Sequence, residues 1–419
     1  MIQHETYDCI VVGGGPAGST VGTLLADYGH RVLLLEKAIF PRHQIGESLM
    51  PHTYWTFKRL GMLDKLKASR HTVKESVQFF SANGKASQPY YFPDHNPHEC
   101  SYTWQVKRDE FDRMMLDNAR EHGVEVHQNA LVKRVLFDGS RATGVRAVVG
   151  DRSIEIRCSV VIDATGQATM LSGQLGLVEP DPGMRHGAIF SYYHGAVRDS
   201  GRDAGAILVV RTPDHNGWFW FIPLLDDVTS VGVVGSPEYL FTNRGNDPMA
   251  TLEVEIERCP ILKSRLAPAT RIAEARVRRD FSYHARRIAG DGWVLVGDAF
   301  GFIDPVYSSG VMLALKGGEL AADTIHAALR DGDVCESRLA AYGSTLVQGM
   351  EMVRRLVHAF YDPSFSFGQF LRRFPDYRDY VARVLIGDVF NDEVGRMFDA
   401  MAEYTAFLPP ITLEQGAAR

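Results

Sequence analysis

The first forty residues carry two strand-like hydrophobic runs with a helical pattern between them. The runs cover Tyr7 to Val12, which is rich in β-branched residues, and Val32 to Leu35. Between them, apolar residues recur at helical spacing from Ala17 to Tyr28, directly after a cluster of glycines. Such an order is typical of a βαβ unit. The N-terminal segment therefore predicts a strand, a helix and a second strand at the start of a parallel sheet.

The pattern becomes largely β after about Lys74. Short strands are expected over Val77 to Phe80 and Tyr90 to Phe92, where Gly and Pro residues separate the apolar runs. A helix is expected from Arg108 to His122, and several strands with polar turns follow it. A second β-rich stretch covers roughly Ala188 to Val234. Strand-rich segments thus alternate with α/β segments along the chain.

The last third of the chain returns to helical spacing. A strand over Trp293 to Val296 and a helix after Ser309 are expected, and beyond about Ala340 the pattern is helical. In this tail, apolar positions recur on one helical face, at Met350, Val353, Leu356, Val357 and Phe360. An aromatic-rich stretch follows, with Phe365, Phe367, Phe370 and Phe374. We interpret this stretch as core packing or a lid-like helix rather than a binding motif.

Composition and charge exclude several classes of protein. The chain has 419 residues, which is more than one ordinary domain needs. Its residues are 45% hydrophobic and 23% charged, a composition typical of globular proteins. A net charge of −6 provides no basic field for nucleic acid or an anionic membrane. Five cysteines without a CxxC pair argue against a zinc site, so no metal is expected. With neither a signal-peptide pattern nor a membrane-length run, we expect a soluble cytoplasmic protein.

A glycine-rich turn lies between the first predicted strand and helix. The segment VVGGGPAGST places Gly13, Gly15 and Gly18 in a GxGxxG pattern, with Ala17 inside it. Glycines let the backbone approach a pyrophosphate closely, and free N–H groups at the helix start favour the anion. Glu36, at the end of the second strand, is positioned to accept hydrogen bonds from ribose hydroxyls. The pattern predicts a dinucleotide site, and both NAD and FAD satisfy it.

Two later segments favour FAD. Val161 to Gly166 (VIDATG) and Trp293 to Pro305 (WVLVGDAFGFIDP) resemble characteristic elements of the glutathione-reductase-like FAD fold of aromatic monooxygenases. The resemblance implies that Asp298 contacts the flavin ribityl chain and that Arg108 lies near the dinucleotide. A helix cap is the alternative role of Asp298. Further cofactor contacts are implied at Lys37, Arg42, Ser48, Pro305, Gly310 and Val311.

Two further motifs narrow the resemblance. Trp218 to Pro223 (WFWFIP) fits a WxWxIP motif, and Phe302 to Gly310 fits an FxxPxxSxG motif. Two tryptophans at i and i+2 fall on one face of a strand, where core packing would be their ordinary role. With both motifs present, the chain is similar to the flavin-dependent halogenases over most of its length. The resemblance implies that Trp218 and Trp220 lie beside the flavin and keep organic substrate away from it.

The same family carries a lysine after a Gly-Glu-Ser segment. Here the segment is Gly46 to Ser48, and Lys74 follows it at a suitable distance, with Lys65 and Lys67 as alternatives. A solvated surface position is the ordinary role of an isolated lysine. A buried lysine can hold hypohalous acid by a hydrogen bond or form a haloamine, which orients an electrophilic halogen toward an aromatic ring. Lys74 is therefore the expected catalytic lysine, together with Trp218 and Trp220.

The second motif ends where a glycine-containing turn enters an apolar helix. Its N–H groups and dipole would bind a halide ion at Ser309 and Gly310, or stabilise the charge of a reduced flavin. Ser308 or Ser309 could instead serve as an ordinary N-cap, and both roles can hold together. The chain has Tyr307 where tryptophan halogenases carry a glutamate before Ser-x-Gly. This tyrosine is more similar to halogenases that act on phenols or pyrroles.

These resemblances predict an α/β protein with a glutathione-reductase-like, Rossmann-type FAD-binding fold, an interleaved β-rich substrate domain and a helical C-terminal tail. The FAD-binding domain is expected at 1–73, 101–185 and 280–340, the substrate domain at 74–100 and 186–279, and the helical region at 341–419.

The expected reaction uses reduced FAD, oxygen and chloride or bromide to make hypohalous acid, which halogenates an electron-rich phenol or pyrrole. A separate flavin reductase is the expected source of reduced FAD, and the ring is either free or attached to a carrier protein. The alternatives are an FAD-dependent aromatic monooxygenase or dehydrogenase, and a flavin-binding accessory protein that acts on a partner protein. The residues leave open the particular ring, the preferred halide and the oligomeric state.

Overall fold

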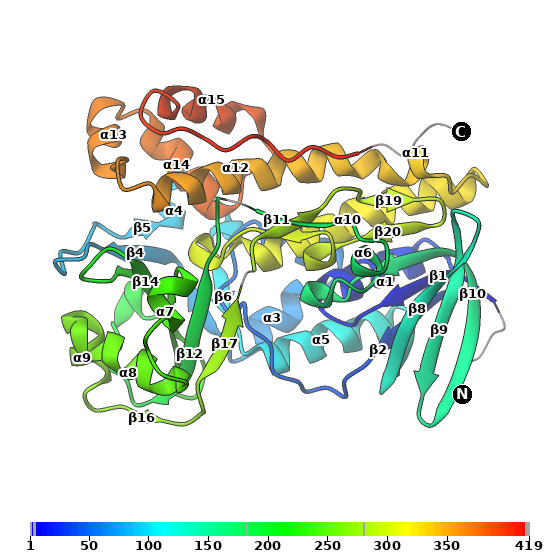
Figure 1. Ribbon diagram of the computed structural model, residues 1–419, viewed down its shortest axis with the longest axis horizontal. Helices are drawn as coiled ribbons and strands as arrows, with labels where there is room; N and C mark the ends of the chain where they lie inside the picture. Colours follow the sequence, from blue (N-terminus) through cyan, green and yellow to red (C-terminus); the bar gives the residue numbers. More distant parts are fainter. Residues whose placement is uncertain (1, 3–5, 182, 280, 415–419) are drawn as a thin grey trace.

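The computed structural model describes residues 2, 6–181, 183–279 and 281–414. The first of its two large sheets consists of Ala289–Gly290 (β19), Trp293–Leu295 (β20), Arg152–Asp163 (β10), Thr6–Val12 (β1), Val32–Glu36 (β2), Glu125–Gln128 (β7), Arg141–Val149 (β9) and Ala130–Asp138 (β8). Their order is β19-β20-β10-β1-β2-β7, and the β9–β8 hairpin extends from β10 (Figure 1).

The centre of this first sheet is parallel and buried. β1 pairs in parallel with β10 and β2, and the parallel order continues to β20 and β7. All five residues of β2 are buried, as expected for a strand that is covered on both faces. Because the strands are parallel, the carboxyl ends of β1, β2, β10 and β20 meet at one edge of the sheet.

The expected βαβ unit is present. α1 (Pro16–Asp27) connects β1 and β2, packs against α10 (Ser309–Arg330), and also contacts α5 (Arg108–Glu121). The segment between β1 and β2 thus enters the core together with a helix that lies about three hundred residues further along the chain. This contact brings the glycine turn and the start of α10 to the same region of the molecule.

The second large sheet is mostly antiparallel. Its strands are Thr270–Arg271 (β16), Gly187–His194 (β12), Val228–Gly235 (β15), Gly217–Pro223 (β14), Ile207–Arg211 (β13), Ser76–Phe80 (β4) and Tyr90–Tyr91 (β5) in that order, and Arg276–Arg279 (β17) pairs with β12. β4 joins β13 in parallel, so a segment from before α5 completes this sheet.

The two faces of the second sheet are buried against different neighbours. On β14, Phe219 and Phe221 pack into a core with the helices α7 (Pro237–Phe241), α8 (Pro248–Arg258) and α9 (Pro260–Leu266). Trp218 and Trp220 point to the opposite face and belong to the main core. The alternation that places both tryptophans on one face follows from the period of two in a strand.

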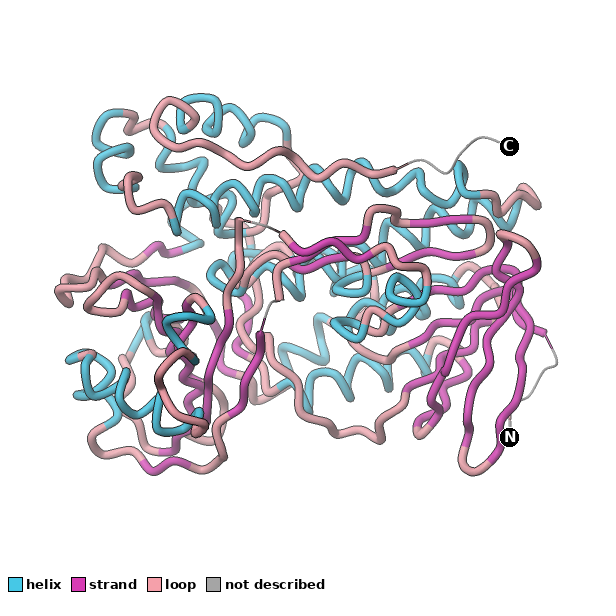
Figure 2. The backbone as a smooth tube through the Cα atoms, in the orientation of Figure 1, coloured by secondary structure: helices cyan, strands magenta, loops and turns pink. Residues whose placement is uncertain are grey.

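A helical C-terminal region covers one side of both sheets (Figure 2). It contains α12 (Gly343–Tyr361), α13 (Phe367–Arg373), α14 (Tyr377–Ile386) and α15 (Asp392–Met401). The apolar face expected on α12 is buried, and α12 packs against α10. The phenylalanine-rich stretch packs on itself and on Tyr377 and Tyr404, with Phe370 and Tyr377 stacked at 5.9 Å between ring centroids. Core packing explains this stretch.

The remaining elements are short. The helices are Thr53–Arg59 (α2), Leu63–Ala68 (α3), Phe92–His95 (α4), Met170–Gln174 (α6) and Glu336–Leu339 (α11), and the strands are Thr72–Lys74 (β3), Thr103–Gln105 (β6), Val178–Pro180 (β11), Tyr283–Ala285 (β18) and Gly301–Phe302 (β21). The β3–β6 pair was not expected from the sequence. The strand expected over Tyr90 to Phe92 ends one residue earlier, because Phe92 and Pro93 begin α4.

The α/β class and the helical C-terminal region are as expected from the sequence. The exact division of the chain into an FAD-binding and a substrate domain stays a prediction, and its boundary residues 1, 280 and 419 lie outside the described residues. Within the described ranges, no helix combines the length and the apolar character needed to span a bilayer.

Candidate functional site

Two glycines of the turn at the end of β1, Gly13 and Gly18, have no room for a side chain. Gly13 has φ +108°, and a Cβ there would lie 2.3 Å from the Ala164 carbonyl oxygen. A Cβ on Gly18 would lie 1.9 Å from the Gly13 carbonyl oxygen. Gly15, the N-cap residue of α1, has no side chain to cap the helix. The helix start therefore presents backbone N–H groups where a pyrophosphate can approach closely.

Glu36 anchors this turn from the end of β2. One carboxylate oxygen accepts the Gly14 N–H at 2.7 Å and the other accepts the Ala38 N–H at 2.8 Å. Each oxygen can still accept a second hydrogen bond, so both can receive a ribose hydroxyl. This contact stays a prediction. Of the neighbouring residues implied by resemblance, Arg42 lies 3.4 Å from the Cβ position of Gly15, whereas Lys37 is exposed.

Arg108 is buried at the start of α5 in a cluster of charges. Its Nε and Nη2 donate to the two carboxylate oxygens of Asp112 at 2.7 and 3.0 Å, and Arg42 Nη1 lies 3.1 Å from the same carboxylate. Arg108 Nη1 donates to the carbonyl oxygens of Ile45 and Gly46. The buried Asp112 carboxylate thus balances the charges of Arg108 and Arg42. Arg108 in turn fixes the segment that leads to Ser48.

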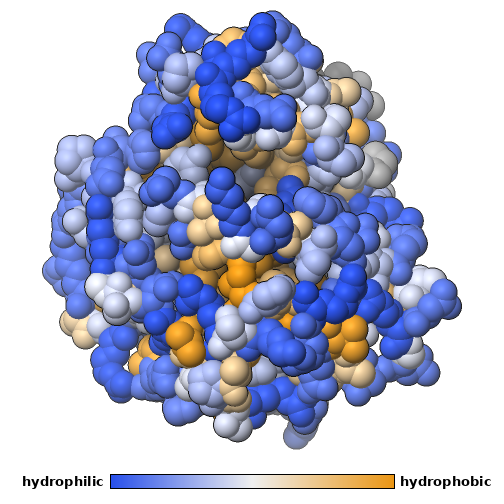
Figure 3. Space-filling view, turned by 90° about the vertical axis from the view of Figure 1, so that its left-hand side faces the viewer, coloured by the Kyte–Doolittle hydropathy of each residue, from blue (hydrophilic) through white to orange (hydrophobic). Residues whose placement is uncertain are grey.

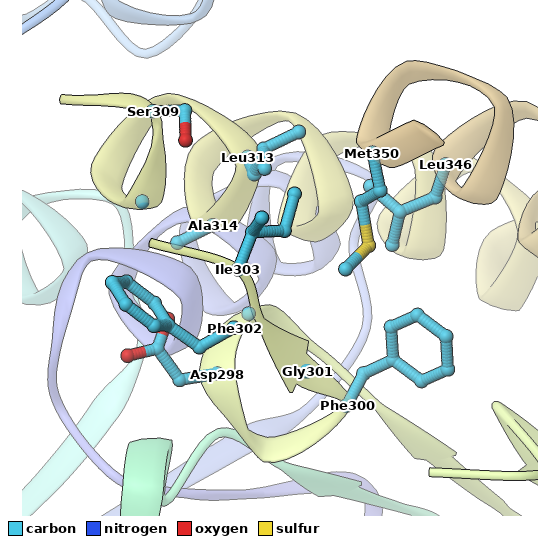
Figure 4. A pocket seen from close by; sticks show the side chains of 12 residues that line it. Asp298, Phe300, Gly301, Phe302, Ile303, Ser309, Leu313, Ala314, Leu346 and Met350 are labelled. Carbon is cyan, nitrogen blue, oxygen red and sulfur yellow. The ribbon is translucent and has the colours of Figure 1, made fainter. Parts of the chain in front are cut away.

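Several of the expected site residues line one cavity beside Asp298. It is lined by Gly297, Asp298, Phe300, Gly301, Phe302, Ile303, Ser309, Gly310, Leu313, Ala314, Leu346 and Met350. Figure 4 shows Asp298 and Phe302 below the first turn of α10, where Ser309 lies. Burial raises the pKa of Asp298 to about 7, although Arg108 lowers it. Among the described residues no side chain donates a hydrogen bond to this carboxylate, which fits a ribityl hydroxyl as its partner.

The start of α10 lacks the side-chain cap that Ser308 or Ser309 could have provided. Ser308 occupies the N-cap position in a left-handed conformation with φ 61°, and its side chain makes no capping hydrogen bond. Ser309 is buried, and a Cβ on Gly310 would lie 2.8 Å from the Phe302 ring. Pro305 lies just before this turn, and the Val311 side chain is buried beside Gly46.

Lys74 is a buried amine at the end of β3. Its Nζ donates to Ser48 Oγ at 2.9 Å and to the Leu49 carbonyl oxygen at 2.8 Å, and it lies 5.5 Å from the centroid of the Phe92 ring. Burial lowers the pKa of Lys74 to about 7. By contrast, Lys65 and Lys67 form surface ion pairs with glutamates. Only Lys74 of the three candidates has the enclosure that amine chemistry requires.

The two tryptophans of the WxWxIP segment form a buried aromatic wall. Their ring centroids are 6.2 Å apart, and both rings are almost fully buried. Trp220 Nε1 donates to Ser230 Oγ at 3.1 Å, while Trp218 Nε1 donates to the Tyr361 hydroxyl at 2.7 Å. Each indole is thus held by a hydroxyl from another part of the chain.

Glu47 shares Ser230 with Trp220 and is next in the chain to Ser48, which holds Lys74, and this role was not expected from the sequence. It is buried, and Oε2 has no hydrogen-bond partner among the described residues. Burial raises the pKa of Glu47 to about 7, while the hydroxyls of Tyr192 and Ser230 lower it. Ser230 also holds Trp220, and the adjacent Ser48 holds Lys74. A single glutamate in the Gly-Glu-Ser segment was the available signal, but its burial depends on the second sheet.

The structure therefore brings most of the expected residues to two adjoining regions. The glycine turn, Glu36, Arg42, Arg108 and Asp298 lie at the carboxyl edge of the first sheet. Lys74 and the tryptophans lie toward the second sheet, linked through Glu47 and Ser48. No group of three His, Cys, Asp or Glu residues suited to a metal ion occurs in the described parts of the chain. Fold and site together define an FAD-dependent enzyme of the α/β class.

Comparisons with known proteins specify the family. The family profile described as "Tryptophan halogenase" matches residues 8–96 and 80–366. The 1H-pyrrole-2-carbonyl-[peptidyl-carrier protein] brominase of Pseudoalteromonas luteoviolacea is 34% identical, over 94% of this chain and 95% of its own length. The corresponding chlorinase of Pseudomonas fluorescens is 30% identical, over 97% and 94%.

A solved structure agrees with these relatives. The flavin-dependent brominase Bmp2 superposes with a TM-score of 0.86 and 30% identity, and the match covers 95% of this chain and 98% of that chain. The chain belongs to this family: it is a flavin-dependent halogenase, an oxidoreductase that uses FAD.

Gly18→Ala tests the tight turn. Because the added Cβ would overlap the Gly13 carbonyl oxygen, the start of α1 must move away from the turn. We expect the affinity for FAD to fall about tenfold or more, since overpacking costs about 1–3 kcal/mol. Gly22→Ala is the control on the same helix, because the nearest atom to its Cβ is 3.6 Å away. Titration with FAD, followed by flavin fluorescence, measures both; equal affinities would contradict the prediction.

The depressed pKa of Lys74 predicts how stability depends on pH. An unfolded lysine titrates near 10.5 and the folded Lys74 near 7, so between these values the unfolded chain binds more protons. The contribution of Lys74 to the free energy of unfolding therefore rises with pH in this window, by up to about 1.4 kcal/mol per pH unit. Urea unfolding of the wild type and of Lys74→Met should show this rise in their difference.

Lys67→Met is the matched control, because the Lys67 side chain lies at the surface in an ion pair with Glu99. Its difference from the wild type should not rise between pH 7 and 10. A constant difference for Lys74→Met across the same range would show that Lys74 titrates normally in the folded protein.

Proposed function

We propose that this halogenase places a halogen on an electron-rich pyrrole or phenol ring, using chloride or bromide as the halogen source. The observation that carries the proposal is a buried amine, Lys74, that is held by Ser48, next in the chain to Glu47, whose partner Ser230 also holds Trp220. When bound in its reduced form, FAD supplies the electrons for the reaction of oxygen that converts halide to hypohalous acid. A separate flavin reductase is the proposed source of these electrons.

The start of α10 is the proposed halide site. Its N–H groups have no side-chain cap, and α10 is 22 residues long, so its dipole favours an anion at Ser309 and Gly310. The ring of Phe302 covers Gly310 and limits the access of water to this turn. Both effects strengthen the attraction between the backbone N–H groups and a small anion.

The proposed role of the tryptophan wall is to keep the organic substrate away from the flavin. Trp218 and Trp220 leave no room for an aromatic substrate beside them, because each ring is packed against other buried aromatic residues. A molecule as small as hypohalous acid needs far less space. The wall therefore restricts the reaction of the organic ring to the region around Lys74.

Lys74 positions the electrophile. With a pKa near 7, ammonium and neutral amine are both populated at neutral pH. The ammonium can donate a hydrogen bond to hypohalous acid, and the neutral amine can attack its halogen to form a haloamine with loss of water. The bonds from Lys74 to Ser48 and Leu49 fix the direction in which the halogen is presented.

The relatives support a pyrrole that is attached to a carrier protein. The brominase and the chlorinase above are both named for 1H-pyrrole-2-carbonyl-[peptidyl-carrier protein]. Tyr307 agrees with the type that lacks a glutamate at this position, and it makes edge contacts with the rings of Phe79 and Phe360. Figure 3 shows apolar residues gathered in a hollow on the face between the C-terminal helices and α8 and α9. Such a hollow favours access for a tethered ring.

Lys74→Met tests the proposal directly. The purified enzyme is supplied with reduced FAD, oxygen and bromide, and with either free pyrrole-2-carboxylate or the same acyl group on a carrier protein. We expect a brominated pyrrole on the carrier, and a loss of at least about a hundredfold in Lys74→Met, because the electrophile is no longer held at the ring. FAD binding should be unchanged.

Lys67→Met is the control for the loss of a lysine charge, and it should retain wild-type turnover. Mass spectrometry of the carrier-bound acyl group measures the product. Hydroxylated product that is independent of bromide would instead favour a monooxygenase, and modification of only a partner protein would favour an accessory role. Full activity in Lys74→Met would remove Lys74 from the mechanism.

A further inference from the structure

The indole of Trp218 is held by a residue from outside its own sheet. Its Nε1 donates to the hydroxyl of Tyr361 at 2.7 Å, and Tyr361 is the last residue of α12 in the helical C-terminal region. The Tyr361 ring is itself fixed, because it stacks on His186 with ring centroids 3.9 Å apart. The position of one wall residue therefore depends on a helix that lies beyond both large sheets.

The same hydroxyl reaches the segment that leads to the proposed halide site. Tyr361 Oη lies 3.0 Å from Asp304 Oδ2, and Asp304 Oδ1 accepts the Val306 N–H at 2.9 Å. An indole N–H can only donate, so the Tyr361 oxygen accepts from Trp218 and its own proton goes to Asp304. Asp304 is fully buried and accepts at both oxygens. The hydrogen bonds thus have one direction, from Trp218 through Tyr361 to Asp304.

Other charges near this chain do not compete with it at neutral pH. The His186 Nδ1 lies 3.6 Å from Asp304 Oδ2, but burial lowers the pKa of His186 to about 4, so the imidazole is neutral. Arg211 packs its guanidinium over the Phe360 ring and donates to the Phe360 carbonyl oxygen. Tyr307 donates to the Leu356 carbonyl oxygen. Tyr361 is therefore the group that links the wall with Asp304.

We propose that Tyr361, oriented by Asp304, is a positioning residue that holds the Trp218 indole in the tryptophan wall. This inference rests on the proposed function of the wall. Without the hydroxyl, the buried indole N–H has no partner, and leaving such a donor unpaired is unfavourable enough to turn the ring or to admit water. Either change opens the wall, so hypohalous acid escapes or reacts away from Lys74.

Tyr361→Phe tests this role, because it keeps the stacked ring and removes only the hydroxyl. The protein contains five tryptophans, and labelling them with ¹⁵N gives one indole N–H signal each, with that of Trp218 assigned by its loss in Trp218→Phe. In Tyr361→Phe we expect the Trp218 indole N–H signal to shift and its proton to exchange faster with solvent. We expect brominated product per oxygen consumed to fall roughly fivefold, and FAD affinity to stay unchanged.

Tyr342→Phe is the matched control. Tyr342 is also a buried tyrosine near the start of the C-terminal region, and its hydroxyl donates to the Leu295 carbonyl oxygen. Its loss should reduce stability without moving the Trp218 signal or the product yield per oxygen. An unchanged Trp218 signal and an unchanged yield in Tyr361→Phe would overturn the proposal. A wild type that makes no halogenated product would instead contradict the proposed function. The indole signals would then still show whether Tyr361 holds Trp218.

A pH titration of the wild type provides a measurement that needs no foldable Tyr361 variant. Burial raises the pKa of Asp304 to about 7, although the Val306 N–H and the Tyr361 hydroxyl lower it. The ionised carboxylate is the stronger acceptor for both donors, and protonation turns one of its oxygens into a donor, so the chain is complete above this pH and weakens below it. We expect the Trp218 indole signal to titrate near pH 7 in the wild type and to stay constant in Asp304→Asn. A signal that titrates alike in both proteins would overturn the orienting role of Asp304.

Discussion

At the start of α5, the guanidinium of Arg108 donates to both carboxylate oxygens of Asp112 and to the carbonyl oxygens of Ile45 and Gly46. These bonds tie the helix to the segment that continues into Glu47 and Ser48. Both side chains are buried, and removing Asp112 would leave the buried Arg108 guanidinium without its carboxylate partner, at a loss of about 3–5 kcal/mol. The positions of the cofactor edge and of the lysine therefore depend on one pair of side chains four residues apart.

Several ionisable groups of the site are buried. Lys74, Glu47 and the pair of Asp298 and Asp304 come from three separate segments, yet burial moves the pKa of each to about 7. Shifts of this size concentrate where desolvated groups take part in binding or proton transfer. Groups whose charge is variable at neutral pH therefore occur both in the Gly-Glu-Ser region near Lys74 and in the segment beside the cavity at Asp298.

The C-terminal helices belong to this site as much as the two sheets do. α12 contributes Leu346 and Met350 to the cavity beside Asp298 and places Tyr361 against Trp218. The apolar face of α12 is visible in the sequence, but its spacing specifies only that the face is buried. Which partner it is buried against follows from the packing of α10, and this is why Tyr361 was not expected near the wall.

Sequence alone determined what depends on local spacing and backbone sterics. The βαβ unit, the tightly packed glycines of the turn and the two tryptophans on one strand face follow from periodicities and motifs within short segments, while Lys74 as the catalytic lysine stays a prediction from the family resemblance. Tertiary structure decided the short β3 strand that carries Lys74, the uncapped start of α10 and the roles of Glu47, Asp304 and Tyr361. Most of these depend on desolvation or on a partner more than twenty residues away, and neither is encoded in the pattern of neighbouring residues.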